Sequence, residues 1–204
     1  MIPKLIHYCW LSDEEKPTVI KQCMKTWNIL KENGFEFMLW DRTKFDVEST
    51  PYTKTCWARK LYAFICDYIR IKALYEYGGI YLDSDVEVYK PFDNFVLDND
   101  YFLTKGFADG INATTMASVK NHEIFKIIKE YYDENILPHP FNKTTTLAME
   151  NRMERILQDY NGLILHDSDY FNPQRNVSEK SYCNHLDMAS WCEPLYHNKN
   201  KKWC

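Results

Sequence analysis

The first part of the chain constrains the fold more than any other segment. Leu5 to Leu11 is a short apolar run with aromatic residues that ends at a polar segment, which is typical of a strand running into a loop. Thr18 can cap a helix that Gly34 ends, and residues 35–40 form a second apolar run. This strand–helix–strand order provides a connection long enough to join two parallel strands. The sequence therefore predicts an α/β sheet.

Length and composition fit one domain. At 204 residues the chain can bury roughly 70% of the surface that its unfolded form exposes. The sequence contains no internal repeat, no low-complexity tract and no interdomain linker, so we expect a single domain over residues 1–204. A net charge of −4 and a pI near 5.9 lack the single-signed basic field that nucleic acid requires, so we expect no nucleic-acid partner.

Several features favour a cytoplasmic protein. The chain does not open with a basic region followed by an apolar stretch and a cleavage site, and no apolar run reaches the ~20 residues that cross a bilayer. The seven cysteines are an odd number without a Cys-x-x-Cys pair, so we expect reduced thiols. Residues 198–204 combine lysines with Trp203, and they predict either peripheral contact with an anionic membrane or a solvated terminus.

Farther along, the apolar pattern predicts one helix over residues 57–77, ended by Gly78-Gly79, and a short strand over 80–82. The downstream elements that the pattern predicts are a strand at 100–104, a helix capped by Asn121 and running through Tyr132, a helix at 146–160, a strand at 163–165 and an irregular tail from Phe171.

Two carboxylates follow the predicted strand 80–82. Asp83 and Asp85 stand one residue apart at the carboxyl end of that strand, where an open α/β sheet tends to place ligands. The short Asp side chains supply hard oxygen ligands, which suit Mg²⁺ or Mn²⁺ and leave coordination positions for phosphate oxygens. The pair therefore predicts a metal site that steadies a diphosphate leaving group. The alternative is that both are solvated turn residues.

The helix before this strand supplies two further candidates. Asp67 and Arg70 are three residues apart, so they share a helix face and place a carboxylate beside a guanidinium. They predict either part of a ligand site or a surface ion pair worth only ~0.5 kcal/mol. Tyr81, two residues before Asp83, is either a ligand contact or a core residue.

Residues 58–70 (ARKLYAFICDYIR) and 74–85 (LYEYGGIYLDSD) closely resemble glycosyltransferase family 32, the Asp-x-Asp sugar-transferase family of bacterial capsular polysaccharide transferases and fungal mannosyltransferases. Residues 2–10, 168–173 and 189–191 resemble its first strand and closing segments. The resemblance implies the nucleotide-diphospho-sugar transferase fold called GT-A, a Rossmann-like domain with a central mixed sheet, and transfer with retained anomeric configuration. It also implies a nucleotide-sugar donor and a Mn²⁺ or Mg²⁺ cofactor.

The resemblance assigns roles to the residues already singled out. Asp85 matches the principal metal ligand, and Asp83 matches the residue that holds the ribose and reaches the metal. Asp67 and Arg70 match the pair that grips the donor sugar and diphosphate in the related glucosylating toxins. Tyr81 is then a candidate ribose contact.

Other matched positions surround the expected donor. Trp10 corresponds to an aromatic surface for the nucleobase, with a buried core residue as the alternative. Asn112 corresponds to a segment facing the acceptor or donor sugar, although an amide that caps a turn has the same appearance. Ser190 and Trp191 match diphosphate contacts. His185 matches a metal or diphosphate contact, but Leu186 follows it where the family often has a second histidine.

The sequence thus predicts a retaining glycosyltransferase that moves a sugar from a UDP-sugar, favoured over a GDP-sugar, to a glycan or lipid-linked oligosaccharide in surface polysaccharide synthesis. Two alternatives stay open. A toxin-like transferase that modifies a protein uses the same arrangement of residues. A non-enzymatic module that binds a divalent cation or carbohydrate would use the carboxylates structurally.

Overall fold

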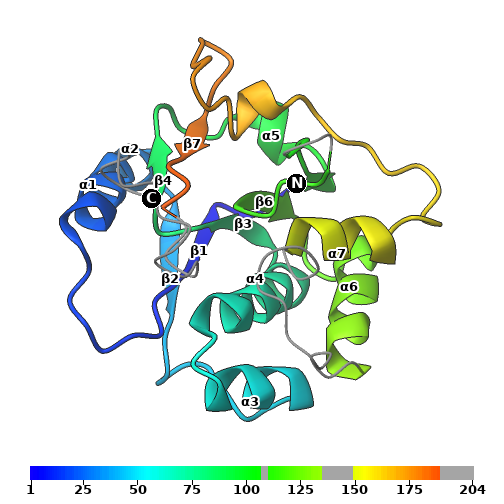
Figure 1. The fold of residues 1–204 in the computed structure, drawn as a ribbon. Coiled ribbons are helices and arrows are strands. Elements are labelled where there is room, and N and C mark those ends of the chain that lie inside the picture. The colour runs from blue at the N-terminus through cyan, green and yellow to red at the C-terminus, as the bar shows by residue number, and fades with distance from the viewer. Residues whose placement is uncertain (107–109, 135–148, 189–204) are drawn as a thin grey trace.

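A five-stranded mixed sheet in the order β2-β1-β3-β6-β5 forms the centre of the fold (Figure 1). The computed structural model describes residues 1–106, 110–134 and 149–188. The first three strands of the order are parallel to one another, and the last two run antiparallel to their neighbours. The strands are β1 (Leu5–Cys9), β2 (Glu36–Trp40), β3 (Gly79–Leu82), β5 (Tyr101–Phe102) and β6 (Thr115–Ser118). The predicted α/β class with a central mixed sheet is confirmed.

Helices cover both faces of this sheet. Side chains of a strand alternate between the two faces, so each face carries apolar residues that the helices bury. On β3, Ile80 and Leu82 belong to one buried apolar cluster and Tyr81 to the other. The first cluster lies against α1 (Thr18–Thr26), α2 (Asn28–Glu32) and α5 (Asn94–Leu97). The second lies against α3 (Pro51–Ala58), α4 (Tyr62–Tyr77), α6 (Glu123–Glu134) and α7 (Met149–Ile156). Among the described residues, no helix is both long and apolar enough to span a bilayer.

A second, two-stranded sheet joins the chain after β3 to the late part of the chain. β4 (Val86–Val88) pairs antiparallel with β7 (Cys183–His185), and the single-turn helix η2 (Ser168–Tyr170) precedes β7. The prediction of an irregular tail from Phe171 is therefore wrong at β7. A three-residue strand has too little pattern of its own to be recognised, and its partner lies far away in the sequence.

The helix predicted over residues 57–77 is two helices. Thr50 caps α3 by accepting a hydrogen bond from the Thr53 N–H, and Pro51 occupies the first turn, so this helix begins well before Trp57. The chain then turns at Lys60, which has a φ of 57°, and α4 starts at Tyr62. Residues 51–56, which precede the predicted helix, therefore belong to α3.

Two downstream predictions differ from the structure, and one strand was not predicted. Residues 163–165 form no strand, and Ile164 is 60% exposed, so its apolar neighbours do not indicate a sheet position. Asn121 has a φ of 62° and lies in a turn, while His122 accepts a hydrogen bond from the Ile124 N–H at the start of α6. The strand β6 was not predicted, because its short sequence gains its strand conformation from pairing with β3. Of the helix predicted at 146–160, residues 146–148 lie outside the described residues.

His7 is a structural histidine on β1, in the interior of the sheet. Its ring is fully buried, the Nε2–H donates to the Gly78 carbonyl at 2.8 Å, and the Trp40 indole N–H donates to Nδ1 at 3.1 Å. These two partners require the neutral ring, since Nδ1 must stay an acceptor. Burial lowers the pKa of His7 to about 4, although the hydrogen bond to Gly78 opposes this fall.

Gly79 allows β1 and β3 to approach each other. Its φ is 107°, and a Cβ atom there would lie 2.3 Å from the Leu5 carbonyl oxygen. That oxygen belongs to the neighbouring backbone and has no room to move. Only glycine therefore fits at the start of the strand that carries Asp83.

We expect acidification to destabilise the protein through His7. The unfolded chain binds a proton near its ordinary pKa of about 6.5 and the native ring only near 4, so stability falls between these values as the pH drops, by up to about 1.4 kcal/mol per pH unit. Urea unfolding at several pH values measures this slope. His7→Gln keeps a donor and an acceptor but does not titrate, so its slope should be shallower. Equal slopes would contradict the assignment.

Gly79→Ala should lower the free energy of unfolding by about 3 kcal/mol, because both the backbone angle and the contact with Leu5 oppose a side chain. Gly34 provides the matched control: its φ is 80°, but nothing lies within 4 Å of the place that a Cβ would take, so Gly34→Ala should cost about 1 kcal/mol. Chemical denaturation compares the two variants. Equal losses would show that the close approach of the strands contributes nothing.

Candidate active site

The turn Asp83-Ser84-Asp85 lies at the carboxyl edge of the parallel strands. The Asp83 N–H donates to the Thr114 carbonyl at 2.9 Å, which extends the pairing of β3 with β6 into the turn. The Ser84 hydroxyl donates to the Cys9 carbonyl at the end of β1, also at 2.9 Å. Both neighbours of β3 therefore hold the turn, and the structure places it directly after a strand, as the sequence predicts.

Asp83 faces the guanidinium of Arg70 on α4. Arg70 Nη2 lies 3.2 Å from Asp83 Oδ1, and Nη1 lies 3.3 Å from Oδ2. Tyr81 donates its hydroxyl to the same Oδ1 at 2.9 Å, and the Arg70 guanidinium lies 4.8 Å from the centre of the Tyr81 ring. This two-pronged contact fixes the orientation of the Asp83 carboxylate.

Arg70 also binds Asp67 and the backbone. Its Nη2 is 3.2 Å from Asp67 Oδ1, and its Nη1 donates to the Ala113 carbonyl at 2.5 Å. The side chains of Arg70 and Asp67 are only 7% and 11% exposed, so they are not the solvated surface pair that the sequence left open. One buried arginine therefore organises two carboxylates from two different elements.

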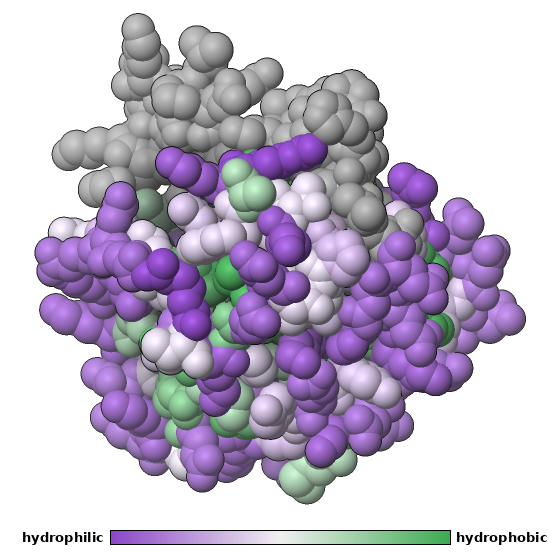
Figure 2. Space-filling view, turned by 90° about the horizontal axis from the view of Figure 1, so that it is seen from below, coloured by the Kyte–Doolittle hydropathy of each residue, from purple (hydrophilic) through white to green (hydrophobic). Residues whose placement is uncertain are grey.

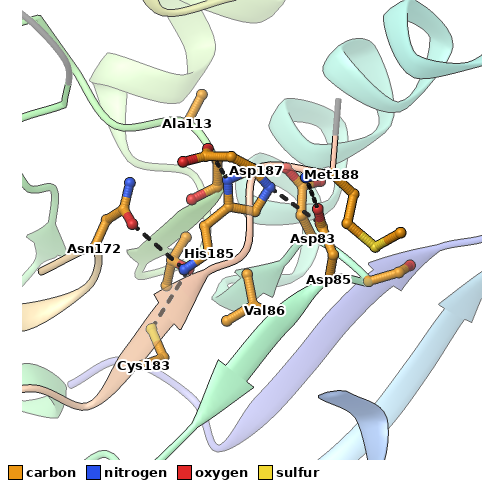
Figure 3. Close-up of polar contacts among 12 residues, drawn as sticks. Asp83, Asp85, Val86, Ala113, Asn172, Cys183, His185, Asp187 and Met188 are labelled. Carbon is orange, nitrogen blue, oxygen red and sulfur yellow. Dashed lines mark hydrogen bonds and ion pairs between the residues drawn. The ribbon is translucent and has the colours of Figure 1, made fainter. Parts of the chain in front are cut away.

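The late segment of the chain folds against Asp85. His185 Nε2 lies 3.1 Å from Asp85 Oδ1, the Met188 N–H donates to Oδ2 at 3.1 Å, and the Leu186 N–H donates to the Asp85 carbonyl (Figure 3). Asp187 holds the other side of the His185 ring, with Oδ1 2.7 Å from Nδ1. The carboxylate of Asp85 is thus bound from β7 and the residues after it.

Asp187 and the Met188 N–H are two site groups that the sequence did not predict. Asp187 has a φ of 49°, a conformation that Asp adopts more readily than most residues, and this turn directs the following N–H to Asp85. An acidic residue two positions after the candidate His185 was the available signal. The backbone donor could not be found from the sequence, since it depends on the path of the chain.

The two carboxylates differ in charge environment. Burial raises the pKa of Asp83, and the positive charge of Arg70 opposes this rise. Burial also acts to raise the pKa of Asp85, but the hydrogen bond and charge of His185 outweigh it, so the net shift is downward. Burial acts to lower the pKa of His185, whereas Asp187 and Asp85 raise it to about 10. His185 is therefore positively charged at neutral pH beside an ionised Asp85.

The donor set fits a divalent cation held by few protein ligands. Asp85 already has a positive charge beside it in the His185 ring, and Asp83 is turned toward Arg70. Throughout residues 1–106, 110–134 and 149–188, no three His, Cys, Asp or Glu side chains form a ready metal cage. The Asp85 carboxylate suits Mn²⁺ or Mg²⁺, the His185 ring can join it only after losing a proton, and oxygens of a bound diphosphate can complete such a shell.

The remaining candidates lie in different environments. Tyr81 is 1% exposed and contacts Asp83 through its hydroxyl, so its ring is core while its polar end belongs to the site. Trp10 is half-buried, donates its indole N–H to the Glu14 carbonyl and has the Lys16 ammonium 4.9 Å from its ring. The predicted contacts Ser190 and Trp191 lie outside the described residues.

Asn112 has a structural role in this conformation. It is fully buried, its carbonyl oxygen accepts hydrogen bonds from the N–H and hydroxyl of Thr114, and its amide donates to Thr104. These bonds shape the segment whose Ala113 carbonyl binds Arg70. The turn-capping alternative that the sequence left open describes this arrangement.

Two solved structures have this fold. The PaToxG glycosyltransferase is 19% identical, with a TM-score of 0.54 over 79% of this chain and 71% of that one. A glycosyltransferase involved in glycosylation of the major capsid of PBCV-1 is 17% identical, with a TM-score of 0.52 over 91% and 94%. The chain has the GT-A glycosyltransferase fold, as predicted.

Sequence comparisons narrow the class to a family. Residues 17–103 match the family described as the glycosyltransferase sugar-binding region containing the DXD motif, and this segment includes Asp67, Arg70, Asp83 and Asp85. An uncharacterized glycosyltransferase of Acanthamoeba polyphaga mimivirus is 26% identical over 231 residues, which cover 98% of this chain and 90% of that protein. The resemblance to glycosyltransferase family 32 is confirmed, and these matches support glycosyltransferase activity.

Two fission yeast proteins are also similar. Inositol phosphoceramide mannosyltransferases 1 and 3 of Schizosaccharomyces pombe are 27% and 28% identical, each over 59% of this chain. The matched segments are only 40% and 34% of those proteins, so this chain corresponds to less than half of either.

Arg70→Met should lower the free energy of unfolding by about 3–5 kcal/mol, because it leaves the Asp67 and Asp83 carboxylates buried without their shared guanidinium. Asp67→Asn in the same chain should recover part of the loss. Lys21→Met is the control, since it breaks an exposed pair with Glu15 and should cost less than about 1 kcal/mol. Thermal or urea unfolding gives the comparison, and an Arg70→Met variant as stable as Lys21→Met would contradict the assigned role.

Proposed function

We propose that this glycosyltransferase transfers a sugar from a nucleotide-diphosphate sugar, with a UDP-sugar favoured, to a glycan or lipid-linked acceptor in surface polysaccharide synthesis, with retention of anomeric configuration. The observation that carries the proposal is the Asp83-Ser84-Asp85 turn, with one carboxylate bound to Arg70 of α4 and the other to His185 of β7. We assign the Arg70 side of the turn to the donor sugar and the His185 side to the metal and the diphosphate.

On the sugar-facing side, Arg70 and Asp67 supply charge and hydrogen-bonding capacity. The guanidinium is held by contacts with two carboxylates and two backbone carbonyls, so it is oriented before the donor arrives. Preorganised donors stabilise developing negative charge without reorganisation at the moment of reaction. We assign Arg70 to the diphosphate and the donor sugar, Asp67 to sugar hydroxyls, and Asp83 with Tyr81 to the ribose.

On the diphosphate-facing side, Asp85 would hold Mn²⁺ or Mg²⁺, and His185 would join it as a ligand once its Nε2 proton is released to solvent. The bound ion would neutralise charge on the leaving nucleoside diphosphate. Asp187 orients the His185 ring, and the Met188 N–H fixes Asp85, so each of the two side chains is held in its orientation by a further hydrogen bond. Ser190 and Trp191, which follow this segment, remain proposed diphosphate contacts.

The base would stack on Trp10 at the end of β1. Its ring is half-buried and already accepts the Lys16 ammonium over one face, so a flat cationic or π-rich group suits it. Asn112 would act by shaping the segment beside Arg70 instead of touching the sugar.

Retention is proposed without a covalent intermediate. Asp83 and Asp67 are both engaged by Arg70, and Asp85 is engaged by His185, so these carboxylates are positioned as ligands and not as nucleophiles. The bond from the anomeric carbon to the β-phosphate oxygen breaks while the acceptor oxygen bonds to that carbon from the same face. The acceptor proton passes to the departing phosphate oxygen.

The names of two relatives support the proposed class of acceptor. The fission yeast proteins are named as mannosyltransferases of a lipid, inositol phosphoceramide, which supports a lipid-borne acceptor. The face of the molecule shown in Figure 2 is predominantly hydrophilic, with apolar side chains in small areas between polar ones, which suits a glycan or headgroup better than acyl chains. Peripheral membrane contact and a cytoplasmic location remain part of the proposal, and residues 198–204 lie outside the described residues.

Incubation with a panel of UDP- and GDP-sugars, with and without Mn²⁺ or Mg²⁺, tests the proposal by release of nucleoside diphosphate. We expect metal-dependent release with one base and a loss of at least about 100-fold in kcat/KM for Asp85→Asn. Asp159→Asn, which changes an exposed carboxylate, should match the wild type.

Three outcomes would contradict parts of this proposal. Absence of turnover with every donor would favour a binding module. Activity of Asp85→Asn equal to wild type would remove the assigned metal ligand. A glycosyl adduct on any side chain, detected by mass spectrometry, would replace the single-step mechanism. An acceptor screen with glycans, lipid-linked sugars and proteins separates surface polysaccharide synthesis from a toxin-like role.

A further inference from the structure

The turn between α3 and α4 carries aromatic and cationic side chains that none of the roles above uses. The Trp57 and Tyr62 rings lie with their centroids 5.4 Å apart and their planes tilted by 55°. Arg59 and Lys60, which stand between them in the sequence, are exposed, and Tyr62 is 38% exposed. These four residues are called the turn patch below.

The turn patch lies at the edge of the sheet that carries Asp83. Strands β1, β2 and β3 are parallel, so their carboxyl ends share one edge. Arg42, in the loop after β2, places its guanidinium carbon 5.8 Å from the centre of the Trp57 ring. It also forms an ion pair with Asp13 in the loop after β1. The loops that follow two parallel strands therefore hold Trp57 at the edge where the acidic turn lies.

Tyr62 and Arg70 lie on one ridge of α4. Tyr62, Cys66 and Arg70 are spaced by four residues, which is the spacing of a side-chain row on a helix. Arg70 Nε donates to the Cys66 carbonyl at 3.4 Å, so its side chain runs back toward the start of the helix. The two ends of the row are about 12 Å apart along the helix axis. The ridge thus leads from the buried guanidinium of the donor site to the exposed ring of the turn patch.

The two cations of the turn patch have no acidic partner. Within residues 1–106, 110–134 and 149–188, neither Arg59 nor Lys60 forms an ion pair. Other cations of the same helices do form them, since Lys54 pairs with Glu48 and Lys72 with Glu76. The turn therefore presents two adjacent positive charges that are free to meet an anion.

The backbone places Lys60 in a conformation that favours glycine. Its φ is 57°, the Leu61 N–H donates to the Cys56 carbonyl at 2.9 Å, and the Lys60 N–H donates to the Trp57 carbonyl at 3.0 Å. This pattern closes many helices with a residue in the left-handed region, where glycine avoids the steric cost of a side chain. An exposed lysine contributes no packing there that would offset the cost. The charge of Lys60 is the feature that needs explanation.

We propose that the turn patch is an acceptor subsite for a sugar joined to phosphate: its two rings pack against the sugar, and its two cations bind the phosphate. The inference rests on the proposed function and names the chemistry of its acceptor. Trp and Tyr rings offer flat apolar faces with a polar end, which suits a sugar ring. Two unpaired cations match the double charge of a phosphate better than the single charge of a carboxylate. The sugar would lie on the side of the patch that leads along the ridge to Arg70.

The test compares sugar 1-phosphates with the matching methyl glycosides. Glucose, galactose, mannose and N-acetylglucosamine 1-phosphates are titrated calorimetrically into the wild-type chain in EDTA, so that no metal ion contributes. At least one sugar 1-phosphate should bind at least about 10-fold more tightly than its methyl glycoside, as expected for hydrogen bonds to a charged group.

Removal of the two charges should abolish this preference. The double variant Arg59→Gln with Lys60→Gln should bind the sugar 1-phosphate and the methyl glycoside within about 2-fold of each other, since the charged contacts are gone. Lys25→Gln with Lys31→Gln is the matched control, because it removes two exposed charges from α1 and α2 on the other face of the sheet. The control should keep the wild-type preference.

Two single variants separate the sugar contact and the phosphate contact. Tyr62→Leu should weaken both ligands by the same factor of about 3 or more and leave inorganic phosphate unaffected, whereas Tyr62→Phe, which keeps the ring, should bind as the wild type does. Lys60→Gly should raise the Tm, because glycine suits the backbone, and should lower the preference for the sugar 1-phosphate. A purely structural Lys60 predicts the higher Tm with an unchanged preference.

The proposal is overturned if no sugar 1-phosphate binds, if the methyl glycosides bind equally well, or if the preference survives loss of both cations. An equal loss in the control variant would show a general effect of charge and would overturn it too. Should the double variant fail to fold, Lys60→Gly decides the question. The donor panel contains no acceptor, so its release of nucleoside diphosphate tests the proposed function without the turn patch, and the two can fail independently.

Discussion

The site depends on one buried cation. Arg70 lies between Asp67 on its own helix and Asp83 after β3, and it also binds the Ala113 carbonyl. A guanidinium with several fixed contacts is an expensive group to bury, and it is stable here because each contact comes from an element that the fold places independently. Helix α4, strand β3 and the segment before β6 must all be in position for the charges to balance. The contacts that balance the charges of the site therefore require the correct packing of the sheet and α4.

Sequence patterns predicted the elements whose signals lie close together in the chain. The strand–helix–strand opening and the Asp-x-Asp turn were recognised because apolar runs, a glycine pair and two carboxylates are close together in the sequence. Strands β6 and β7 were missed because Thr115–Ser118 and Cys183–His185 obtain their conformation from distant partners. Helical spacing places Asp67 beside Arg70, but only the structure distinguishes a buried pair from a surface one.

The two carboxylates of the motif have separate neighbours and separate surroundings. Asp83 is bound by Arg70 and Tyr81 from the helical side, and Asp85 is bound by His185 and the Met188 N–H from the late segment. Adjacent acidic residues would otherwise repel each other, and opposite partners on either side reduce that repulsion. Division of the turn in this way suits a ligand with a sugar at one end and a diphosphate at the other.

The pairing of β4 with β7 has a consequence for synthesis of the protein. Asp85 and Met188 are 103 residues apart, yet the second supplies a hydrogen bond that fixes the carboxylate of the first. A chain emerging from the ribosome makes the sheet and the acidic turn long before it makes the strand that completes them. Half-finished chains consequently have the Asp83–Asp85 turn without His185, and the proposed donor site is complete only when translation has passed that late strand.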